Sequence, residues 1–425
     1  MSIKSFWKNR GDVGIWIIVA IFAMISVVAV FSSSSFLARG AEVTKVDFLI
    51  EQLGSVALGF FFLFILYFIP MKWYRSLSIA AYICAVVLVI IGLAFGETIN
   101  GANRGVRIAG RTIQVLEPAK IAIVLYLARA IELFKIDNFW RYLLYLILPV
   151  AVLCLLVIVS SFSSAVIIAV LSLLTLIIAG INWRYILATI GLGLAAFFIL
   201  FFIYKQTAPS TYITSDGIEV VAEHKSQKDP SIFYKVFNRF GVIVDRFTQH
   251  TVTSDDIDIS AKSQEEADEI RQSENAKIAI REGGLLGKGP GNSTQRYHLS
   301  LAFSDFIFAF IIEEYGLFFA TFLMLLYLAF LARTINIGME CNTKYGSLVS
   351  IGLGMLITIQ ALIHILVNVR IIPITGQTLP LISHGGTAYF FLSGAVGIIL
   401  SISRTINERK QVEPEKKKKL RNEEI

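Results

Sequence analysis

About ten apolar runs, each near 20 residues long, dominate this 425-residue chain. A helix needs about 20 predominantly apolar residues to cross the hydrocarbon core of a bilayer, because each residue adds a rise of about 1.5 Å. Hydrophobic residues make up 56% of the sequence and charged residues only 16%, which is more apolar sequence than a soluble core can bury. We therefore predict an all-α integral membrane protein, a polytopic bundle of about ten transmembrane helices with one large extracytoplasmic loop.

We expect the spans at residues 14–36, 52–70, 77–95, 118–135, 141–159, 162–180, 184–204, 304–332, 346–369 and 385–403. The chain then divides into a cytoplasmic N-terminus at 1–13, transmembrane helices 1–7 at 14–204, an extracytoplasmic loop at 205–303, transmembrane helices 8–10 at 304–404 and a cytoplasmic basic tail at 405–425.

The distribution of lysine and arginine predicts the orientation. An even number of spans places both termini on one side, and basic residues gather at the span ends of that side and in the tail. Cytoplasmic loops are enriched in lysine and arginine, so both termini are predicted in the cytoplasm. The loop at 205–303 and two shorter loops, at 96–117 and 371–383, then face outward. Nucleotide donors are absent there, so an outward-facing enzyme must use a substrate that is already activated.

The basic tail, which includes Lys416 to Lys419, is predicted as a solvated, disordered end that touches anionic headgroups. Because the net charge of +7 collects in the tail and at span ends, it does not indicate nucleic acid as a partner. The three cysteines, Cys84, Cys154 and Cys341, fall in spans or on the cytoplasmic side. They indicate neither a disulfide framework nor a metal site.

Asp305 is the candidate catalytic residue, since it lies where the outer loop enters the eighth span. An ionisable group at that depth is a functional-site hypothesis by default. A glycine-rich segment from Gly283 to Gln295 precedes it, and its glycines allow close approach to a ligand. Lys288 supplies positive charge in that segment, and Asn292 supplies a polar side chain. The alternative reading of Asp305 is a helix N-cap, which contributes about 1 kcal/mol.

A second candidate group lies around the first outer loop. Glu117 and Lys120 are three residues apart at the start of a helix, so they face the same way and can pair. The alternative is a snorkelling lysine beside a carboxylate at the helix start. Arg104, Arg107 and Arg111 lie just upstream, and together they favour a cationic patch suited to a pyrophosphate group.

The last outer loop contains a Ser383-His384 pair among two prolines and three glycines. This composition predicts a re-entrant or broken segment packed inside the protein, because non-helical backbone survives at membrane depth only when it is buried or lines a cavity. The two residues are not a catalytic triad, since adjacent residues do not by themselves place a base against a nucleophile. A structural hydrogen bond to backbone and a substrate contact stay open as roles for His384.

Glu313 and Glu314 follow Asp305 by eight and nine residues, roughly 12–14 Å further along a continuous helix. Buried carboxylates need partners, and His364 and Asn368 of the next span reach a similar depth. We expect these four residues to form a structural polar lock between the two helices.

Four signatures in this order resemble the SEDS family (shape, elongation, division and sporulation), the FtsW/RodA/SpoVE group of bacterial membrane proteins. They are Asn100-Gly101-Ala102 with Arg104, Gln114-x-x-Glu117-x-x-Lys120, the glycine-rich run from Gly283 to Gln295, and Ser304-Asp305-Phe306-Ile307-Phe308. The run from Leu379 to Thr387 is similar to a fifth, although His384 stands where the family usually has tyrosine. The likeness covers nearly the whole chain, and the opening residues are more similar to the division branch than to the elongation branch.

The resemblance implies a peptidoglycan glycosyltransferase of the bacterial cytoplasmic (inner) membrane. It would polymerise lipid II by inverting glycosyl transfer, release undecaprenyl pyrophosphate, and work with a class B penicillin-binding protein and other divisome membrane proteins. The resemblance implies that Asp305 corresponds to the aspartate that is essential for catalysis in the family. The residues expected to bind substrate are Arg104, Glu117, Lys120, Lys288, Asn292, Gln295, Ser383 and His384.

Several alternatives stay open at this point. A lipid II flippase would need a polar path through the whole bilayer, and a non-catalytic scaffold for the penicillin-binding protein would tolerate loss of Asp305. A role in elongation is the alternative to one in division. No cofactor is required by the sequence, and assistance from a divalent cation, Mg²⁺ or Mn²⁺, is left open.

Overall fold

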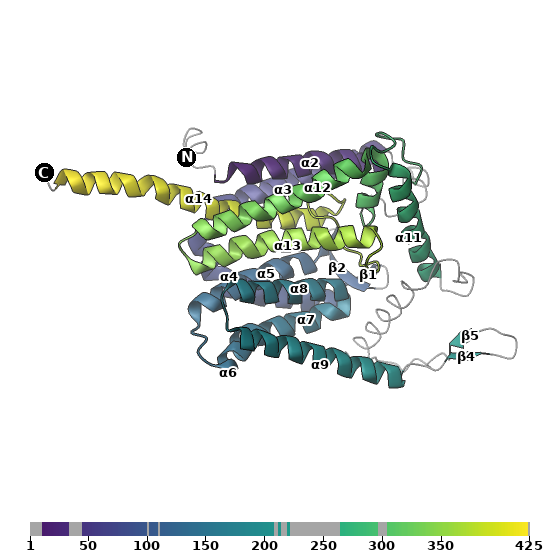
Figure 1. Cartoon of the computed structure of the whole chain (residues 1–425), viewed down its shortest axis with the longest axis horizontal. Helices are drawn as coiled ribbons and strands as arrows, with labels where there is room; N and C mark the ends of the chain where they lie inside the picture. Colours follow the sequence, from purple (N-terminus) through teal and green to yellow (C-terminus); the bar gives the residue numbers. More distant parts are fainter. Residues whose placement is uncertain are drawn as a thin grey trace.

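The computed structural model describes residues 11–33, 45–99, 102–108, 111–207, 211–213, 219–221, 264–295 and 304–423. Within these residues, ten apolar helical segments run side by side in one bundle (Figure 1). They are α2 (Val13–Ser33), α3 (Lys45–Phe68), α4 (Met71–Phe95), α5 (Leu116–Leu133), the continuous α6 (Phe139–Tyr142), η2 (Leu143–Ile147) and α7 (Leu148–Ser160), α8 (Phe162–Ile178), α9 (Trp183–Thr207), α12 (Ile307–Glu340), α13 (Lys344–Asn368) and α14 (Gly386–Glu423). Each one overlaps a predicted span, and among the described residues seven are long and apolar enough to cross a membrane. The prediction of an all-helical polytopic membrane bundle is confirmed.

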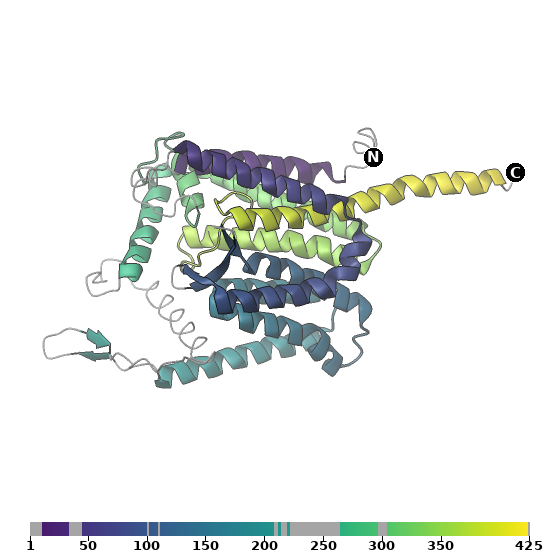
Figure 2. The ribbon, with the colours of Figure 1, turned by 180° about the vertical axis from the view of Figure 1, so that it is seen from behind.

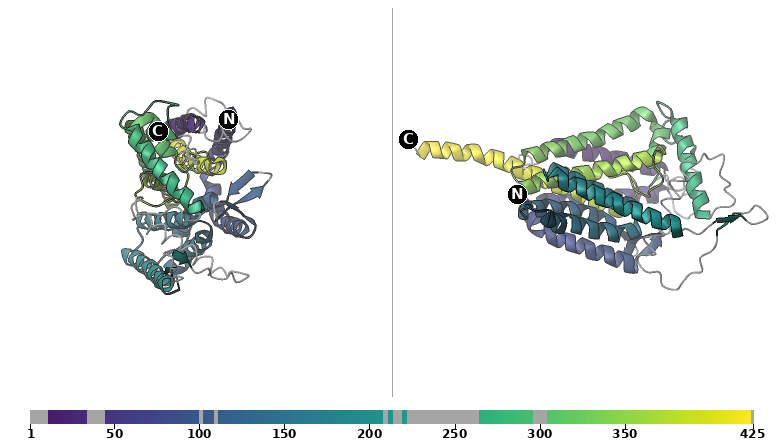
Figure 3. Two further views of the ribbon diagram at one scale, coloured as in Figure 1. Left: turned by 90° about the vertical axis from the view of Figure 1, so that its right-hand side faces the viewer. Right: turned by 60° about the horizontal axis from the view of Figure 1, so that its bottom comes forward.

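The centre and the rim of the bundle are both apolar but differ in burial. In α13 and α14, 78% of the most apolar 18-residue window is buried, whereas the corresponding share in α3 is 17%. At one edge of the bundle α9 packs beside α8 (Figure 3). It exposes large apolar side chains along its length, including Leu192, Phe198 and Phe202. A helix with so much exposed apolar surface fits contact with lipid tails.

Polar elements gather at one end of the bundle, which we call the outer end (Figure 2). A three-stranded antiparallel sheet, β1 (Glu97–Ile99), β2 (Ala102–Ile108) and β3 (Arg111–Gln114), connects α4 to α5, and β4 (Thr211–Ile213) pairs with β5 (Glu219–Val221) beyond α9. A further helix, α11 (Gln264–Gly283), lies across this end. At the opposite end, α2 begins and α14 projects outward.

The helix α12 is broken at Gly316, where φ is 81° and ψ is 172°. The residues before the break run across the outer end, and the residues after it run along the bundle (Figure 1). Glu313 and Glu314 precede the break, so the expectation that they lie 12–14 Å deeper on a continuous helix is wrong. Glycine permits this break because it has no Cβ to clash at positive φ.

Several helices extend beyond their apolar runs. The tail that was predicted as disordered is instead helical, since α14 continues to Glu423. Likewise, α3 begins at Lys45, before its predicted span at 52–70, and α12 ends at Glu340, beyond its predicted span at 304–332. Lysine, glutamate and arginine are strong helix formers, so a helix continues in water where hydropathy no longer reports it.

Candidate functional site

Asp305 lies at the outer end, directly before α12, and its side chain is partly exposed. The hydroxyl of Ser304 donates a hydrogen bond to its Oδ1 over 2.8 Å. The N-cap position belongs to Phe306, and no side chain within α12 caps the helix there. Instead, the amide N–H of Ala309 donates to Oδ1 of Asn368 over 2.9 Å. The alternative reading of Asp305 as the helix cap is therefore wrong, because Asn368 of α13 fills that role.

Glu117 and Lys120 form a buried ion pair with 2.7 Å between Nζ and Oε1, which confirms the expected pairing. The Lys120 side chain is 0% exposed and that of Glu117 is 6% exposed, so the snorkelling alternative is wrong. Nζ also donates to Oε1 of Gln360 over 3.2 Å and to Oε1 of Gln377 over 3.5 Å. These amides offset part of the desolvation cost, which is several kcal/mol for each ion taken out of water.

A chain of hydrogen bonds joins this ion pair to Asp305. The side chain of Gln377 accepts from Lys120, and its backbone carbonyl accepts from Nδ1–H of His364 over 2.8 Å. Nδ2 of Asn368 donates over 2.9 Å to the carbonyls of both His364 and Asp305. Gln377 therefore belongs to the site although the sequence reasoning did not select it. Its position in the last outer loop, six residues before Ser383, was the available signal.

Two buried atoms of this network have no hydrogen-bond partner in the described part of the chain, namely Oε2 of Glu117 and Nε2 of His364. Since Nδ1 of His364 carries the proton donated to Gln377, Nε2 is an acceptor in the neutral ring. Buried polar atoms are normally hydrogen-bonded. Both atoms are therefore available to a polar group of a substrate or to water.

The glycine-rich segment packs directly on the broken part of α12. The amides of Lys288 and Gly289 donate to the carbonyls of Glu313 and Glu314, each over 2.9 Å, and the amide of Leu317 donates to Gly284 over 3.0 Å. The close approach that glycine permits is thus an approach to protein backbone in this structure.

Glu313 is fully buried and fastens the same segment. It accepts hydrogen bonds from Nζ of Lys288 over 3.1 Å, from the amide and hydroxyl of Thr294 over 2.8 and 2.9 Å, and from the amide of Gln295 over 3.3 Å. Glu314 accepts from the amide of Gly291 over 3.0 Å. Glu314 also accepts from the hydroxyl of Ser32 of α2 over 2.7 Å. The expected polar lock of these carboxylates with His364 and Asn368 is therefore wrong, since their partners lie in the glycine-rich segment and in α2.

Three residues predicted to bind substrate hold this segment in shape. Lys288 is paired with Glu282 as well as with Glu313, and its ammonium, with the hydroxyl of Thr294, keeps the pKa of the Glu282 carboxyl below its ordinary value. Nδ2 of Asn292 donates to the carbonyl of Lys288 over 3.1 Å. Gln295 is buried, and its backbone amide donates a hydrogen bond to the carboxylate of Glu313. All of these contacts are made within the protein.

The packing of this segment predicts a sharp contrast between two glycines with nearly equal φ, 78° at Gly287 and 77° at Gly291. A Cβ at Gly287 would lie 2.3 Å from the carbonyl oxygen of Glu314, whereas a Cβ at Gly291 meets nothing within 4 Å. We expect Gly287→Ala to reduce the unfolding free energy by roughly 1–3 kcal/mol more than Gly291→Ala does. The measurement is the thermal midpoint of the two purified variants, which should be clearly lower for Gly287→Ala. Equal midpoints for the two variants would contradict this packing.

The last outer loop is an irregular, largely buried segment, as predicted, and it brings Ser383 beside Asp305. The Ser383 hydroxyl donates to the carbonyl of Ser304 over 2.8 Å and accepts from the amide of Leu379 over 2.8 Å. His384 faces α3, where its Nδ1–H donates to Oε1 of Gln52 over 2.8 Å. Burial lowers the pKa of His384, with Glu51 acting in the opposite direction, so the ring is neutral at pH 7.

Arg104 lies on β2, and its side chain is outside the described residues. The sheet is tied to the bundle by the amide of Gln114, which donates to the hydroxyl of Thr387 over 3.3 Å. Among the described residues no group of three or more His, Cys, Asp or Glu side chains lies together.

Comparison with known proteins identifies the family. The model of the cell cycle protein family FtsW/RodA/SpoVE matches residues 13–215 and 257–408. The chain belongs to the FtsW/RodA/SpoVE family. A protein of Hydrogenovibrio crunogenus named "Probable peptidoglycan glycosyltransferase FtsW" is 28% identical over 404 residues, which cover 93% of this chain and 92% of that protein. A protein of the same name from Enterococcus hirae is 29% identical and covers 96% of each chain.

The fold of this FtsW/RodA/SpoVE protein is shared with a chain in a structure titled "Structural coordination of polymerization and crosslinking by a peptidoglycan synthase complex". The TM-score is 0.68 at 20% identity, and the match covers 93% of this chain and 98% of the other. The likeness shows the same helical architecture. The family membership and the helices together make this chain a multi-pass membrane protein.

Proposed function

We propose that this FtsW/RodA/SpoVE protein is a peptidoglycan glycosyltransferase that polymerises lipid II into glycan strands. The single observation that carries the proposal is Asp305, a partly exposed carboxylate at the outer end whose backbone is linked through Asn368 to the buried network of Glu117 and Lys120. The names of the relatives from Hydrogenovibrio crunogenus and Enterococcus hirae support the same activity. The description of the matching family as cell cycle proteins supports a role in cell division.

In this proposal Asp305 is the general base. It accepts the proton of the acceptor sugar's 4-hydroxyl while that oxygen bonds to the anomeric carbon of the donor. The bond from that carbon to the pyrophosphate oxygen breaks, and undecaprenyl pyrophosphate leaves with the electron pair. Attack from the face opposite the leaving group inverts the anomeric centre. General-base assistance of this kind contributes about 10²–10⁴ in rate.

Two other functions make different demands. A flippase would carry lipid II across the whole bilayer, whereas the site network joins the outer ends of α5, α12 and α13. A scaffold would need the fold and not the carboxylate. The network favours the enzyme, because a buried ion pair linked to the backbone of an outward aspartate serves chemistry better than simple recruitment.

We further propose a class B penicillin-binding protein and other divisome membrane proteins as partners. The similar chain in the peptidoglycan synthase complex supports an assembly of this kind. A divalent cation, Mg²⁺ or Mn²⁺, is proposed only as a counter-ion of the pyrophosphate, since the described residues assemble no cluster of metal ligands. No step is assigned to it.

The experiment that tests the function is polymerisation of labelled lipid II by the purified full-length chain, alone and with its class B penicillin-binding protein. Glycan strands resolved by electrophoresis are the expected product. Inversion shows as β-linked product from α-linked donor. Lipid II crossing the bilayer of proteoliposomes without any polymer would support the flippase instead.

The proposed orientation places the outer end outside a bacterial cytoplasmic membrane and both termini in the cytoplasm. In a background without Cys84, Cys154 and Cys341, we expect Arg281→Cys to react with an impermeant thiol reagent on intact cells. Lys135→Cys should react only after permeabilisation. Both side chains are exposed in the structure, so access to the reagent is matched. Labelling of Lys135→Cys alone on intact cells would reverse the orientation.

A further inference from the structure

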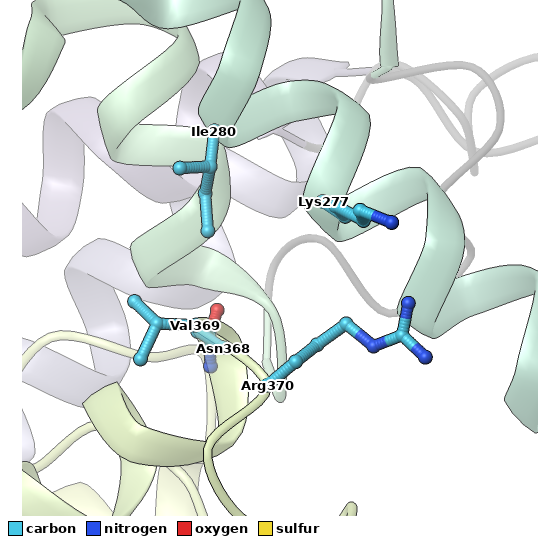
Figure 4. Close-up of a pocket in the computed structure, with 5 residues that line it drawn as sticks. All are labelled: Lys277, Ile280, Asn368, Val369 and Arg370. Carbon is cyan, nitrogen blue, oxygen red and sulfur yellow. The ribbon is translucent and has the colours of Figure 1, made fainter. Parts of the chain in front are cut away.

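A cavity of about 340 Å³ lies between α11 and the outer end of α13 (Figure 4). Small-molecule sites usually measure about 300–1,000 Å³, so this cavity has the size of a ligand site. The residues that line it are Lys277, Ile280, Asn368, Val369 and Arg370. In Figure 4 the ammonium of Lys277 and the guanidinium of Arg370 both extend to the same side, away from Ile280 and Val369.

The backbone of Arg370 is held in an unusual conformation. Its φ is +57°, in the left-handed region that residues with a Cβ rarely adopt. Arg370 follows the C-cap of α13, Val369, at the position where glycine is the usual residue. A side chain that persists in strained backbone is a reason to look for a function. Here the strain accompanies a guanidinium that lines a cavity.

The charges around the cavity leave an excess of positive charge. Arg370 pairs with Glu274 of α11, with side-chain exposures of 25% and 27%. Lys277, one turn further along α11, makes no ion pair with any residue that the structure describes. Two cations therefore face one carboxylate, so the cavity favours an anion. A guanidinium fork matches the oxygens of a phosphate group in two parallel hydrogen bonds.

The cavity adjoins the proposed catalytic residue. Asn368 lines it, and the same side-chain amide donates to the carbonyl of Asp305 over 2.9 Å. We propose that Lys277 and Arg370 bind the phosphate or pyrophosphate group of a lipid-linked molecule, and that this group takes the place of Glu274 beside Arg370. That the group is the pyrophosphate of a sugar donor or of the released polyprenyl carrier rests on the proposed function. A phospholipid headgroup presents the same chemistry.

The test is equilibrium binding of two probes to the purified full-length chain in a neutral detergent. One probe is radiolabelled undecaprenyl pyrophosphate and the other is radiolabelled phosphatidylglycerol. Arg370→Gly removes the guanidinium and also relieves the positive φ, so the variant is expected to fold. It should bind the probe about tenfold more weakly, as expected for a lost charge-assisted hydrogen bond. Lys277→Gln should weaken binding several-fold.

Glu274→Gln separates a ligand site from a salt bridge that only holds α11. If the carboxylate competes with a bound phosphate, its removal should tighten binding while Arg370→Gly loosens it. If the pair is only structural, both variants should change binding in the same direction, and that outcome overturns the proposal. Arg281→Gln is the matched control, since it removes an exposed cation from α11 outside the cavity lining and should leave binding unchanged.

The two probes identify the source of the phosphate. Preference for undecaprenyl pyrophosphate supports a subsite for the donor or the released carrier, and equal binding of phosphatidylglycerol supports a headgroup site. Unchanged binding of both probes by Arg370→Gly overturns the site itself. The binding series should be the same in an Asp305→Asn background. Failure of the proposed function, seen as normal polymerisation by Asp305→Asn, is therefore distinct from failure of the phosphate site.

Discussion

Asp305→Asn is expected to lower the rate of lipid II polymerisation by about 10²–10⁴-fold, because asparagine cannot accept the proton of the acceptor hydroxyl. The variant should fold normally. The side-chain oxygen that caps α12 belongs to Asn368 and is not changed by the substitution. The hydroxyl of Ser304 can donate to the Oδ1 of an asparagine at position 305 as it does to that of Asp305. The measurement is polymerisation of labelled lipid II, together with the thermal midpoint and co-purification with the penicillin-binding protein.

Asn368→Ala is the control that separates capping from catalysis. It removes the acceptor for the amide of Ala309 and the donor to the carbonyls of His364 and Asp305, so it should reduce the unfolding free energy by about 1–3 kcal/mol. Asp305→Asn should leave the thermal midpoint unchanged while it removes activity. Near-normal polymerisation by Asp305→Asn would exclude the role of base and favour a scaffold.

Breaking the ion pair of Glu117 and Lys120 is expected to have the largest effect on stability. Lys120→Met leaves the Glu117 carboxylate buried without its partner, and Glu117→Gln does the same to the ammonium. Removing one partner of a buried pair typically costs 3–5 kcal/mol in unfolding free energy. We therefore expect a large fall in the thermal midpoint and loss of polymerisation in either single variant.

The double variant Glu117→Gln with Lys120→Met removes both charges and should recover most of the stability, since neutral replacement of a buried pair is often tolerated. If polymerisation stays lost, the pair acts in the site, and if it returns with the fold, the pair is structural. Arg129 and Glu132 are a matched control on the same helix, with the same spacing and 2.9 Å between Nη1 and Oε2. Their side chains are 21% and 15% exposed, and Glu132 also pairs with Arg75 over 2.7 Å. Arg129→Gln breaks only the matched pair and leaves Glu132 a second cation, so it should cost about 1 kcal/mol or less.

Some features of the site depend on local spacing and could be predicted. Residues three apart on a helix face the same way, which is why the pairing of Glu117 with Lys120 followed from the sequence. The composition of the last outer loop likewise predicted a buried irregular segment, and the structure places Ser383 in it next to the backbone of Ser304. The resemblance indicated the importance of Asp305, but only the tertiary structure shows its hydrogen-bonding neighbours.

Other features depend on contacts between distant parts of the chain. Glu313 and Glu314 were assigned to His364 and Asn368 because both pairs were expected at one depth along straight helices. The break at Gly316 removed that basis, and the carboxylates bind the preceding glycine-rich segment instead. The cap of α12 comes from Asn368, which is 63 residues away from Asp305 along the chain. Local sequence carries no signal for such a partner.

By itself, the sequence determined the all-helical membrane class, the ten apolar helical segments and the pairing within α5, because these follow from the length of apolar runs and the helical repeat. The tertiary structure alone decided which spans are central and which polar side chains meet. Lipid tails are as apolar as a protein interior, so hydropathy does not distinguish the buried α13 from the exposed α9. Packing then brings Gln377 to Lys120 and Asn368 to Asp305, because buried polar groups must be satisfied by whatever partner the bundle places within reach.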